Sequence, residues 1–496
     1  MQYSAQLDAL AVNINCAVYI YMKKLRLIQK WQNKHPYIQV MEQIRSLVES
    51  GAWSNGMRLS ERWIAKECGV SRSTASKALL HLRDEGLVTI IPSSGTHVSC
   101  KQMSASSITW ERIANRAHIV RDSIDRRIWI GNTPRSSRDQ AMFSIHKDFN
   151  AKEPLIQAMH ALYGKGIDDS FFCTDMMGHR ILRNTVAKHL QKDGIHTNPN
   201  NIIIFSCFIE AVSIISKALL NHGVNVYFAQ HNHFMSLPTL FSYGVNMHSI
   251  ATDNEGIIPE VFENKLKPGQ GVLVLTTIYD YPTGITTSEK RLKQIYQICR
   301  KNRIIIIENA MLRDLWCGAP IITLKSLDKH DQVIFIGTMI NNFNTSTYYV
   351  WTVVPDAILP QIMDAKTQNS PFLSGLNSAI TNEMLEGGYY NAFLERLKGQ
   401  LPGRARVINN ILQKRLTGLA KWHPECSIFN LWLEFQPEVN TELFLDKLSF
   451  TYVPGRVFSG KPNYLYTTAL AFAPDELDEM MGEIAIQTKK QLKKPF

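Results

Sequence analysis

Residues 58–98 read RLSERWIAKECGVSRSTASKALLHLRDEGLVTIIPSSGTHV, and this stretch decides the fold of the N-terminal part of the chain. Ser60 and Ser71 are of a residue type that caps helices, and each precedes a run with apolar residues at helical spacing. Gly69 lies between the two runs, where a tight turn joins them. We therefore expect two short helices, the first ending at Cys68 and the second beginning with small polar and basic residues. Such a pair fits the major groove of DNA.

The segments on either side of this helix pair complete a winged helix. Over residues 37–48 the apolar side chains fall at helical spacing, which predicts a preceding helix. After Gly86 the pattern changes to two short runs, 87–91 and 96–98, on either side of a turn. These runs predict the two strands of a wing beside the second helix of the pair.

The second helix of the pair and the wing supply the candidate contacts with DNA. Arg72 and Lys77 can reach base edges or phosphates. The hydroxyls of Ser71 and Ser73, with the N–H groups of the helix start, can hold a phosphate. Gly95 lets the wing backbone approach the minor groove. Each of these residues alone could equally be a helix cap or a surface charge. On these two elements the candidates are Ser71, Arg72, Ser73, Thr74, Lys77, Gly95 and Thr96.

Composition and charge agree with an N-terminal part that meets a polyanion. The chain has 496 residues, of which 45% are hydrophobic and 20% charged, so it can bury more than one core. The formal net charge is +11, and residues 1–150 hold 21 Lys and Arg against 12 Asp and Glu. Basic residues are thus concentrated at one end, which suggests nucleic acid as a partner, with a solvated basic surface as the alternative.

Other features of the sequence argue against metal and membrane binding. The eight cysteines stand singly, without a second cysteine or a histidine at metal-ligand spacing, and we expect reduced thiols in a cytoplasmic protein. The stretch 7–22 is too polar to span a bilayer and predicts a short helix of unknown purpose. We therefore expect no metal site and no membrane partner.

The rest of the chain predicts a linker followed by an α/β domain. Residues 101–140 show no sustained periodicity, which is typical of a linker. From about residue 141, amphipathic helices alternate with apolar β-branched runs, and this alternation favours a largely parallel sheet covered by helices. The runs are 202–205, 224–228, 272–275, 304–307 and 333–336.

The N-terminal motifs resemble the winged helix-turn-helix of GntR-type bacterial regulators. The resemblance lies in residues 58–65, 69–74, 82–87 and 94–98. It implies that Arg62 and the Ser71, Arg72 and Ser73 start of the last helix contact operator DNA. A proline that is usual before the middle helix is missing, and Ser76 stands where many members carry a further basic residue. The resemblance therefore does not extend to the target sequence.

The large domain resembles the fold-type I aminotransferases, and its combination with a GntR-type reader is the layout of the MocR subfamily. Family landmarks occur in the expected order at 175–178, 253–257, 281–284, 304–308, 337–338 and 353–355. The resemblance implies an α/β fold with a mostly parallel sheet. It also implies a homodimer.

The chemistry of that family uses pyridoxal phosphate, and it needs groups that this sequence lacks at the matching positions. A lysine must form the Schiff base with the cofactor, and Asn341 stands in its place. An acidic residue must hold a proton on the pyridine nitrogen, and Asn309 stands there as a neutral amide, with Met311 in place of a family tyrosine. These three differences predict a domain without the cofactor.

Further positions of the cofactor and substrate site also differ from the family. The segment 206–209, Ser-Cys-Phe-Ile, puts bulky side chains in the phosphate-binding loop. Tyr348 replaces a basic residue that grips the phosphate, and Ala469 replaces the arginine that binds the substrate carboxylate. The aromatic residue that stacks on the cofactor falls near His233 or Phe234, so this element alone is retained.

The sequence therefore predicts an α/β protein with four parts. A helical extension (1–33) precedes a winged helix-turn-helix (34–100), and a linker (101–140) joins it to a fold-type I aminotransferase-like domain (141–496) divided near residue 370. We expect a sequence-specific transcriptional regulator of the bacterial cytoplasm that binds double-stranded DNA as a homodimer. The large domain would be no enzyme and would serve dimerisation, with its vacated pocket open to an effector or a protein.

Two alternative functions are compatible with parts of the sequence. The first is a cofactor-sensing MocR-type regulator or a transaminase that binds pyridoxal phosphate non-covalently or through another lysine. The second is an interaction protein whose winged helix binds a protein instead of DNA. Salt-dependent binding to DNA distinguishes the second alternative from the leading hypothesis, because contacts with phosphates release counterions.

Overall fold

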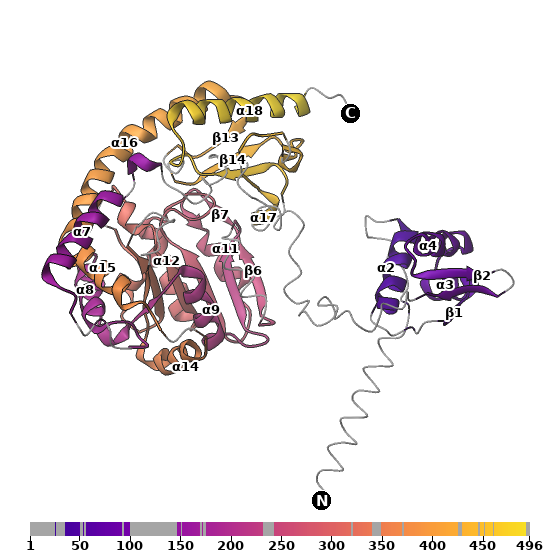
Figure 1. Ribbon diagram of the computed structural model, residues 1–496, viewed down its shortest axis with the longest axis horizontal. Helices are drawn as coiled ribbons and strands as arrows, with labels where there is room; N and C mark the ends of the chain where they lie inside the picture. The colour runs from indigo at the N-terminus through magenta and orange to yellow at the C-terminus, as the bar shows by residue number, and fades with distance from the viewer. Residues whose placement is uncertain are drawn as a thin grey trace, which may run out of the picture. The chain divides into compact units, whose positions relative to one another are not determined.

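The chain divides into two compact units, Met1–Ala114 and Asn115–Phe496, in a computed structural model (Figure 1). The structure describes residues 25, 35–49, 53, 56–91, 94–99, 146–149, 151–168, 171, 175–231, 243–318, 321–339, 349–369, 372–424, 429–444, 447–450, 452–459 and 461–492. The short N-terminal helix expected at 7–22 and the linker expected at 101–140 lie outside these residues.

The described part of the first unit is a winged helix. It contains three helices and a three-stranded antiparallel sheet in the order β1-β3-β2. Its elements are α2 (Pro36–Glu49), β1 (Arg58–Leu59), α3 (Glu61–Cys68), α4 (Arg72–Asp84), β2 (Val88–Ile91) and β3 (Gly95–Val98). The three helices and the two strands of the wing were predicted, whereas β1 was not.

Apolar side chains from all three helices and the sheet build the core of this unit. Ile44 of α2, Ile64 of α3 and Leu82 of α4 are fully buried. Val88 and Val98 face each other across the β2–β3 pair and are also buried. The inward side chains of α4 recur at helical spacing, so its polar first turn is left on the outside.

The second unit is built on a seven-stranded sheet in the order β4-β12-β11-β10-β9-β5-β6. The neighbours from β11 to β6 pair in parallel, and β12 is antiparallel to both β11 and β4. The mostly parallel sheet therefore agrees with the predicted fold class. Its strands are β4 (Ile202–Phe205), β5 (Asn225–Ala229), β6 (Asn246–Ile250), β9 (Gly271–Thr276), β10 (Ile305–Asn309), β11 (Val333–Thr338) and β12 (Val350–Val353).

Helices cover both faces of this sheet, as Figure 1 shows. Alternate residues of β4 enter different cores, because successive side chains of a strand point to opposite faces. Ile202 and Ile204 join the core that includes α7, α8, α15 and α16, whereas Ile203 and Phe205 join the core with α9 and α14. The helices are α7 (Lys152–Lys165), α8 (Arg180–Gln191), α9 (Phe208–Leu219), α11 (Pro259–Lys265), α12 (Glu289–Lys301), α13 (Leu324–Leu327), α14 (Leu359–Asn369), α15 (Gly375–Glu386) and α16 (Tyr389–Leu416).

A smaller antiparallel sheet follows α16 and is called here the C-terminal sheet. Its strands have the order β13-β14-β16-β15, and the sheet packs with α16 and α18 around a separate core. The elements are β13 (Ala420–Lys421), β14 (Leu431–Phe435), β15 (Val453–Pro454), α17 (Arg456–Ser459), β16 (Tyr464–Thr467) and α18 (Pro474–Leu492). The remaining short elements are β7 (Thr252–Asp253), β8 (Gly256–Ile257) and 3-10 turns at Lys147–Phe149, Pro199–Asn201, Arg313–Leu315, Asp356–Ile358 and Thr441–Phe444.

Candidate functional site

Hydroxyl groups organise the N-terminus of α4. Ser71 is the N-cap, and its Oγ accepts a hydrogen bond from the Thr74 backbone N–H at 3.1 Å. The same Oγ lies 2.8 Å from the Ser73 and Thr74 hydroxyl oxygens. Arg72 is exposed in the first turn. Hydroxyls, helix N–H groups and one cation therefore meet at a surface that suits a phosphate or a base edge.

A cap and a left-handed turn fix α3 beside α4. The Ser60 hydroxyl accepts a hydrogen bond from the Trp63 backbone N–H at 3.4 Å. Gly69 ends the helix at a φ of 65°, a conformation that glycine adopts without steric cost. Arg62 is exposed in the first turn of α3. The structure thus places both predicted arginines, Arg62 and Arg72, on the surface at helix N-termini.

Ion pairs occupy two other arginines of the first unit. Arg45 of α2 contacts Glu85 with an N–O distance of 2.6 Å, and Arg83 contacts Asp84 at 2.8 Å. By contrast, none of the described residues forms an ion pair with the exposed side chains Arg58, Lys66, Arg62 and Arg72. The charges left for an external anion are therefore concentrated on α3, the start of α4 and β1.

Lys77, a predicted DNA contact, lies against an aromatic ring. Its Nζ is 4.2 Å from the centre of the Tyr37 ring, and that ring also stacks on His81 at 5.3 Å. This cation–π contact joins α4 to α2. Lys77 would have to leave the ring to reach DNA, so we expect a weaker contribution from it than from Arg72.

The wing is the hairpin of β2 and β3. Gly95 at its turn has a φ of 96°, which disfavours any residue with a Cβ. A Cβ at this position would lie 3.5 Å from the Arg58 Nε. The Arg58 guanidinium therefore lies against the wing turn, where its positive charge is available to an external anion. The sequence did not indicate this role, because a two-residue strand leaves no local signal and its partners are in the distant wing.

Thr96, another predicted DNA contact, lies in β3 with its side chain largely buried, so a contact of its backbone with DNA stays a prediction. The residue is only 7% exposed, because it pairs with Leu59 of β1 and its side chain faces the inside of the sheet. The exposed apolar residues of the wing are instead Ile90 and Ile91, at 41% and 45%.

In the second unit, the carboxyl ends of the parallel strands are the place where open α/β sheets bind ligands. Asn309 ends β10 there. Its side-chain N–H donates to the Thr276 hydroxyl oxygen at 3.3 Å, and its carbonyl oxygen accepts from the Met311 backbone N–H at 3.2 Å. The amide is thus engaged by its neighbours, and it carries no negative charge for a pyridinium nitrogen.

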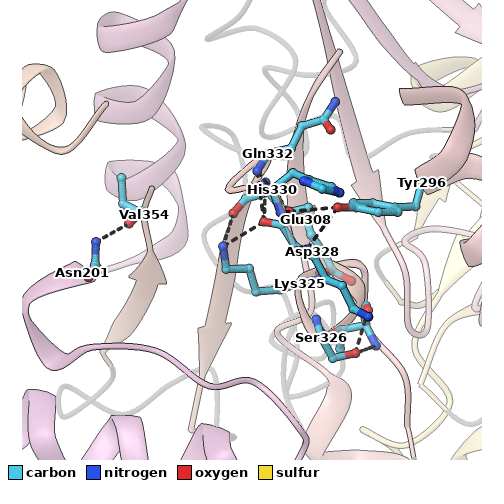
Figure 2. Close-up of polar contacts among 12 residues, drawn as sticks. Asn201, Tyr296, Glu308, Lys325, Ser326, Asp328, His330, Gln332 and Val354 are labelled. Atoms are coloured by element: carbon cyan, nitrogen blue, oxygen red, sulfur yellow. Dashed lines mark hydrogen bonds and ion pairs between the residues drawn. The ribbon is translucent and has the colours of Figure 1, made fainter. Parts of the chain in front are cut away.

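Glu308 does not take over the acidic role of the missing aspartate. It precedes Asn309 in β10 and points to the opposite face, where it is fully buried. Its carboxylate accepts hydrogen bonds from the backbone N–H groups of Leu324 and Lys325, each at 2.8 Å, and from the Thr277 hydroxyl at 2.9 Å. Figure 2 shows Glu308 in the polar network around Asp328 at the start of β11.

The loop between β4 and α9 corresponds to the predicted phosphate loop. Cys207 is the N-cap of α9, and its sulfur accepts from the Glu210 backbone N–H at 3.5 Å. The Glu210 carboxylate accepts the Ser206 backbone N–H at 2.7 Å and also contacts the Ser206 hydroxyl. The chain's own carboxylate therefore lies at the end of the helix that would face an anion.

Aromatic side chains of the C-terminal sheet and α17 pack against the loops that follow β5 and β9. The Tyr281 ring lies 4.5 Å from Tyr466 and 5.5 Å from Phe458 between ring centres. His231 lies 5.4 Å from Trp432, and burial lowers the pKa of its imidazole, which favours the neutral form. Aromatic rings therefore fill part of the carboxyl-end region.

The remaining predicted positions divide into one buried residue and several outside the described residues. Ala469 is fully buried in the core of the C-terminal sheet, so it offers no charge to a substrate carboxylate. Asn341, Tyr348, His233 and Phe234 lie outside the described residues.

The described residues do not fit pyridoxal phosphate. Its phosphate is an anion, whereas the Glu210 carboxylate already occupies the N-terminal end of α9. Its pyridine nitrogen needs an acidic partner, whereas Asn309 is a neutral amide bonded to Thr276.

A cavity of about 290 Å³ lies elsewhere in the second unit, beside α16. Tyr279 and Trp316 form aromatic walls, and Leu401 and Pro402 of α16 add apolar surface. Among the described residues that line it there is no Lys, Arg, Asp or Glu. Its size and lining suit a small uncharged molecule.

Two negative findings concern the described residues only. Within them, no group of three His, Cys, Asp or Glu side chains is arranged to hold a metal ion. None of their helices is both long and apolar enough to cross a membrane.

Two family profiles match separate parts of the chain. Residues 36–98 match the bacterial regulatory proteins of the gntR family. Residues 146–459 match the aminotransferases of class I and II. The first match covers the winged helix, and the second covers the seven-stranded sheet and much of the C-terminal sheet.

Similar proteins include named regulators and solved aminotransferases. The HTH-type transcriptional regulator YdfD of Bacillus subtilis is 26% identical over 94% of this chain and 98% of its own length. The HTH-type transcriptional regulator NorG of Staphylococcus aureus is 22% identical over 87% of this chain and 99% of its own length. The structure of Pyrococcus horikoshii kynurenine aminotransferase matches with a TM-score of 0.71 and 21% identity, over 78% of this chain and 99% of that one. This last likeness shows the fold alone.

Proposed function

The chain belongs to the class I and II aminotransferase family and joins that fold to a GntR-family winged helix, and from this premise we propose that it is a sequence-specific DNA-binding transcriptional regulator. Full-length similarity to proteins named as HTH-type transcriptional regulators supports the proposal. The residues proposed to contact DNA are Arg62, Ser71, Arg72, Ser73, Thr74 and Lys77, with Gly95 and the backbone at Thr96 in the wing.

One observation carries this proposal. Arg62 and Arg72 are exposed at the N-termini of two adjoining helices, and no described acidic residue pairs with either. Two other arginines of the unit, Arg45 and Arg83, are neutralised locally by Glu85 and Asp84. A positive surface formed by helix N-termini and unpaired arginines is what a phosphate backbone and guanine edges require.

The large domain is proposed to have lost its enzymatic role. Asn341 stands where the family resemblance places the cofactor lysine, and an amide side chain forms no Schiff base. The engaged amide of Asn309 and the Glu210 carboxylate at α9 support the same conclusion. The proposed protein therefore acts without pyridoxal phosphate.

The large domain is proposed instead to hold two DNA readers together and to receive a signal. A homodimer would place two winged helices on paired half-sites, and the gain in affinity would come from bivalency. The uncharged cavity beside α16 is a candidate place for a small effector. The proposed setting is the bacterial cytoplasm, and the proposed parts are 1–33, 34–100, 101–140 and 141–496.

Selection of DNA sequences by the full-length protein tests the proposal. Rounds of binding to a random duplex library should enrich a motif, and affinity for that motif should fall steeply with added salt. Arg72→Ala should weaken binding by roughly 10- to 100-fold, which corresponds to one lost base or phosphate contact. The matched control Arg83→Ala, whose side chain is already paired, should bind like the wild type. Enrichment of no motif would reject the proposal.

Spectroscopy tests the non-enzymatic part separately. After incubation with pyridoxal phosphate and gel filtration, the protein should carry no visible absorbance of the cofactor. A protein-bound chromophore that survives filtration would instead favour the cofactor-sensing alternative.

A further inference from the structure

We propose that Glu210 is an internal anion that takes the place of a cofactor phosphate at the N-terminal end of α9, and that its contact with Lys366 makes the folded domain independent of any external anion. The inference rests on the part of the proposed function that denies the large domain a cofactor. It does not depend on DNA binding.

The carboxylate of Glu210, a residue of α9 itself, supplies a negative charge and a hydrogen-bond acceptor at the N-terminal end of this helix. β4 ends at Phe205 and α9 begins at Phe208, so the connecting residues must turn sharply at the edge of the sheet. The Ser206 backbone N–H donates to Glu210 Oε2 at 2.7 Å, and the Ser206 hydroxyl donates to the same oxygen. A full negative charge at this end of a helix is favourable, because the unpaired N–H groups carry a partial positive charge.

A buried lysine provides a second and independent observation. Lys366 of α14 is fully buried, and its Nζ lies 4.0 Å from Glu210 Oε1 and 5.3 Å from the centre of the Phe205 ring. A cation removed from water is costly unless an anion accompanies it. An ordinary helix cap at the surface has no need of a buried lysine beneath it. The two charges therefore form a unit that joins α9 to α14.

The position of the second carboxylate oxygen agrees with this unit. Glu210 Oε1 is buried and accepts no hydrogen bond from the described residues. Only 12% of the Glu210 side chain is exposed. Oε1 is thus turned inward, toward Lys366, while Oε2 accepts the hydrogen bonds from Ser206. An external phosphate at the same helix end would compete with this carboxylate for the Ser206 N–H, and the repulsion of like charges would oppose its binding.

Thermal unfolding of the full-length protein tests the proposal. Melting is followed by intrinsic fluorescence in sodium chloride, in inorganic phosphate and in pyridoxal phosphate, all at one ionic strength. The wild-type Tm should be the same in all three. Glu210→Ala should melt about 2 to 4 °C lower in chloride and recover about half of that loss in 10 mM phosphate, because the vacated helix end can then take an anion.

Glu289→Ala is the matched control. Glu289 is also an acidic residue in the first turn of a helix, α12, but it is exposed and pairs with Lys293. Its removal should shift Tm by less than about 1 °C and create no phosphate response. If phosphate or pyridoxal phosphate stabilises the wild type as much as Glu210→Ala, the helix end is open and the proposal is wrong. If Glu210→Ala behaves like Glu289→Ala, the proposal is equally wrong.

A milder set of variants covers the case in which Glu210→Ala does not fold. Glu210→Gln and Lys366→Met remove the charges but keep the side-chain size. If the two charges form one unit, the double variant should lose clearly less Tm than the sum of the two single losses. Losses that simply add would contradict the pair. The DNA affinity of the same proteins is measured in parallel. A failure of the regulator hypothesis would appear as absent DNA binding, and the melting temperatures would still test the role of Glu210.

Discussion

Local charge pairing separates the cations of the winged helix into those with an acidic partner and those without one. Arg45 and Arg83 have acidic partners within the unit, and Lys77 rests on the Tyr37 ring. The other exposed cations without a described acidic partner lie at two helix starts, near the end of α3 and at the base of the wing; they are Arg62, Arg72, Lys66 and Arg58. Residue type alone could not have separated these groups.

Arg58 is expected to contribute to DNA affinity through a phosphate. Its guanidinium lies against the wing turn at Gly95 rather than at the base-reading helix. Arg58→Ala should therefore weaken binding to all DNA sequences alike, by roughly 3- to 10-fold. It should also reduce the slope of log affinity against log salt concentration by about one. Fluorescence anisotropy with the selected motif and with a scrambled duplex measures both effects. A loss confined to the selected motif would show that Arg58 reads bases instead.

We expect the Asp280 carboxyl to make the stability of the protein depend on pH. Burial raises the pKa of this carboxyl from 3.8 to about 8, against the opposing hydrogen bond from Thr283. Between these two values the folded state binds a proton that the unfolded state does not, so this stabilisation is complete at low pH and is lost as the pH rises toward 8. Asp280→Asn should remove the dependence.

Urea unfolding at pH 5, 6.5 and 8 measures this effect. The wild type should lose on the order of 1 kcal/mol more of its unfolding free energy between pH 5 and pH 8 than Asp280→Asn, because the residue is only partly buried and water screens its charge. Parallel pH profiles for the two proteins would show that Asp280 is already ionised in the folded state.

At the scale of elements, one carboxylate fixes the loop between α13 and β11. Asp328 accepts hydrogen bonds from the Tyr296 hydroxyl at 3.1 Å, the Lys325 Nζ at 3.0 Å and the Val333 backbone N–H at 2.9 Å (Figure 2). Its side chain is fully buried. The loop sets the start of β11, the strand that leads to the segment with Asn341.

Asp328→Asn should destabilise the second unit by about 2 to 3 kcal/mol, because the buried Lys325 loses its counter-charge and some donors lose their acceptor. Asp331→Asn in the same loop is the control. Asp331 is exposed and has a φ of 51°, which asparagine also tolerates, so its unfolding free energy should be unchanged within about 0.5 kcal/mol. Equal stability of the two variants in chemical unfolding would contradict a structural role for Asp328.

Elements with local signals could be predicted from the sequence, and elements that depend on distant partners could not. Ser60 and Ser71 indicate the starts of α3 and α4, because an N-cap side chain forms its hydrogen bond with the first turn of its own helix. β1 has two residues and exists only through its pairing with the wing. Likewise, nothing near Glu210 in the sequence indicates Lys366, which reaches it from α14. The mostly parallel sheet was predictable because its buried strands are continuous apolar runs.

At the scale of the whole molecule, residues 1–150 are basic and the rest of the chain is nearly neutral, while residues 34–100 hold 8 Lys and Arg against 6 Asp and Glu. Of the net charge of +11, most lies within residues 1–150. The second unit carries an aminotransferase fold in which we propose that a neutral amide, a carboxylate and aromatic rings stand in place of the cofactor contacts. Such a division is what a regulator needs, because its output is occupancy of DNA rather than a product.

Genome-wide occupancy of the purified protein on sheared DNA from its source organism tests this account most directly. The wild type should be found at discrete sites that share the sequence motif selected in vitro, and those sites should be lost with Arg72→Ala but kept with Arg83→Ala. Uniform or absent occupancy by the wild type, or discrete sites that Arg72→Ala retains, would contradict a regulator that reads DNA through α4.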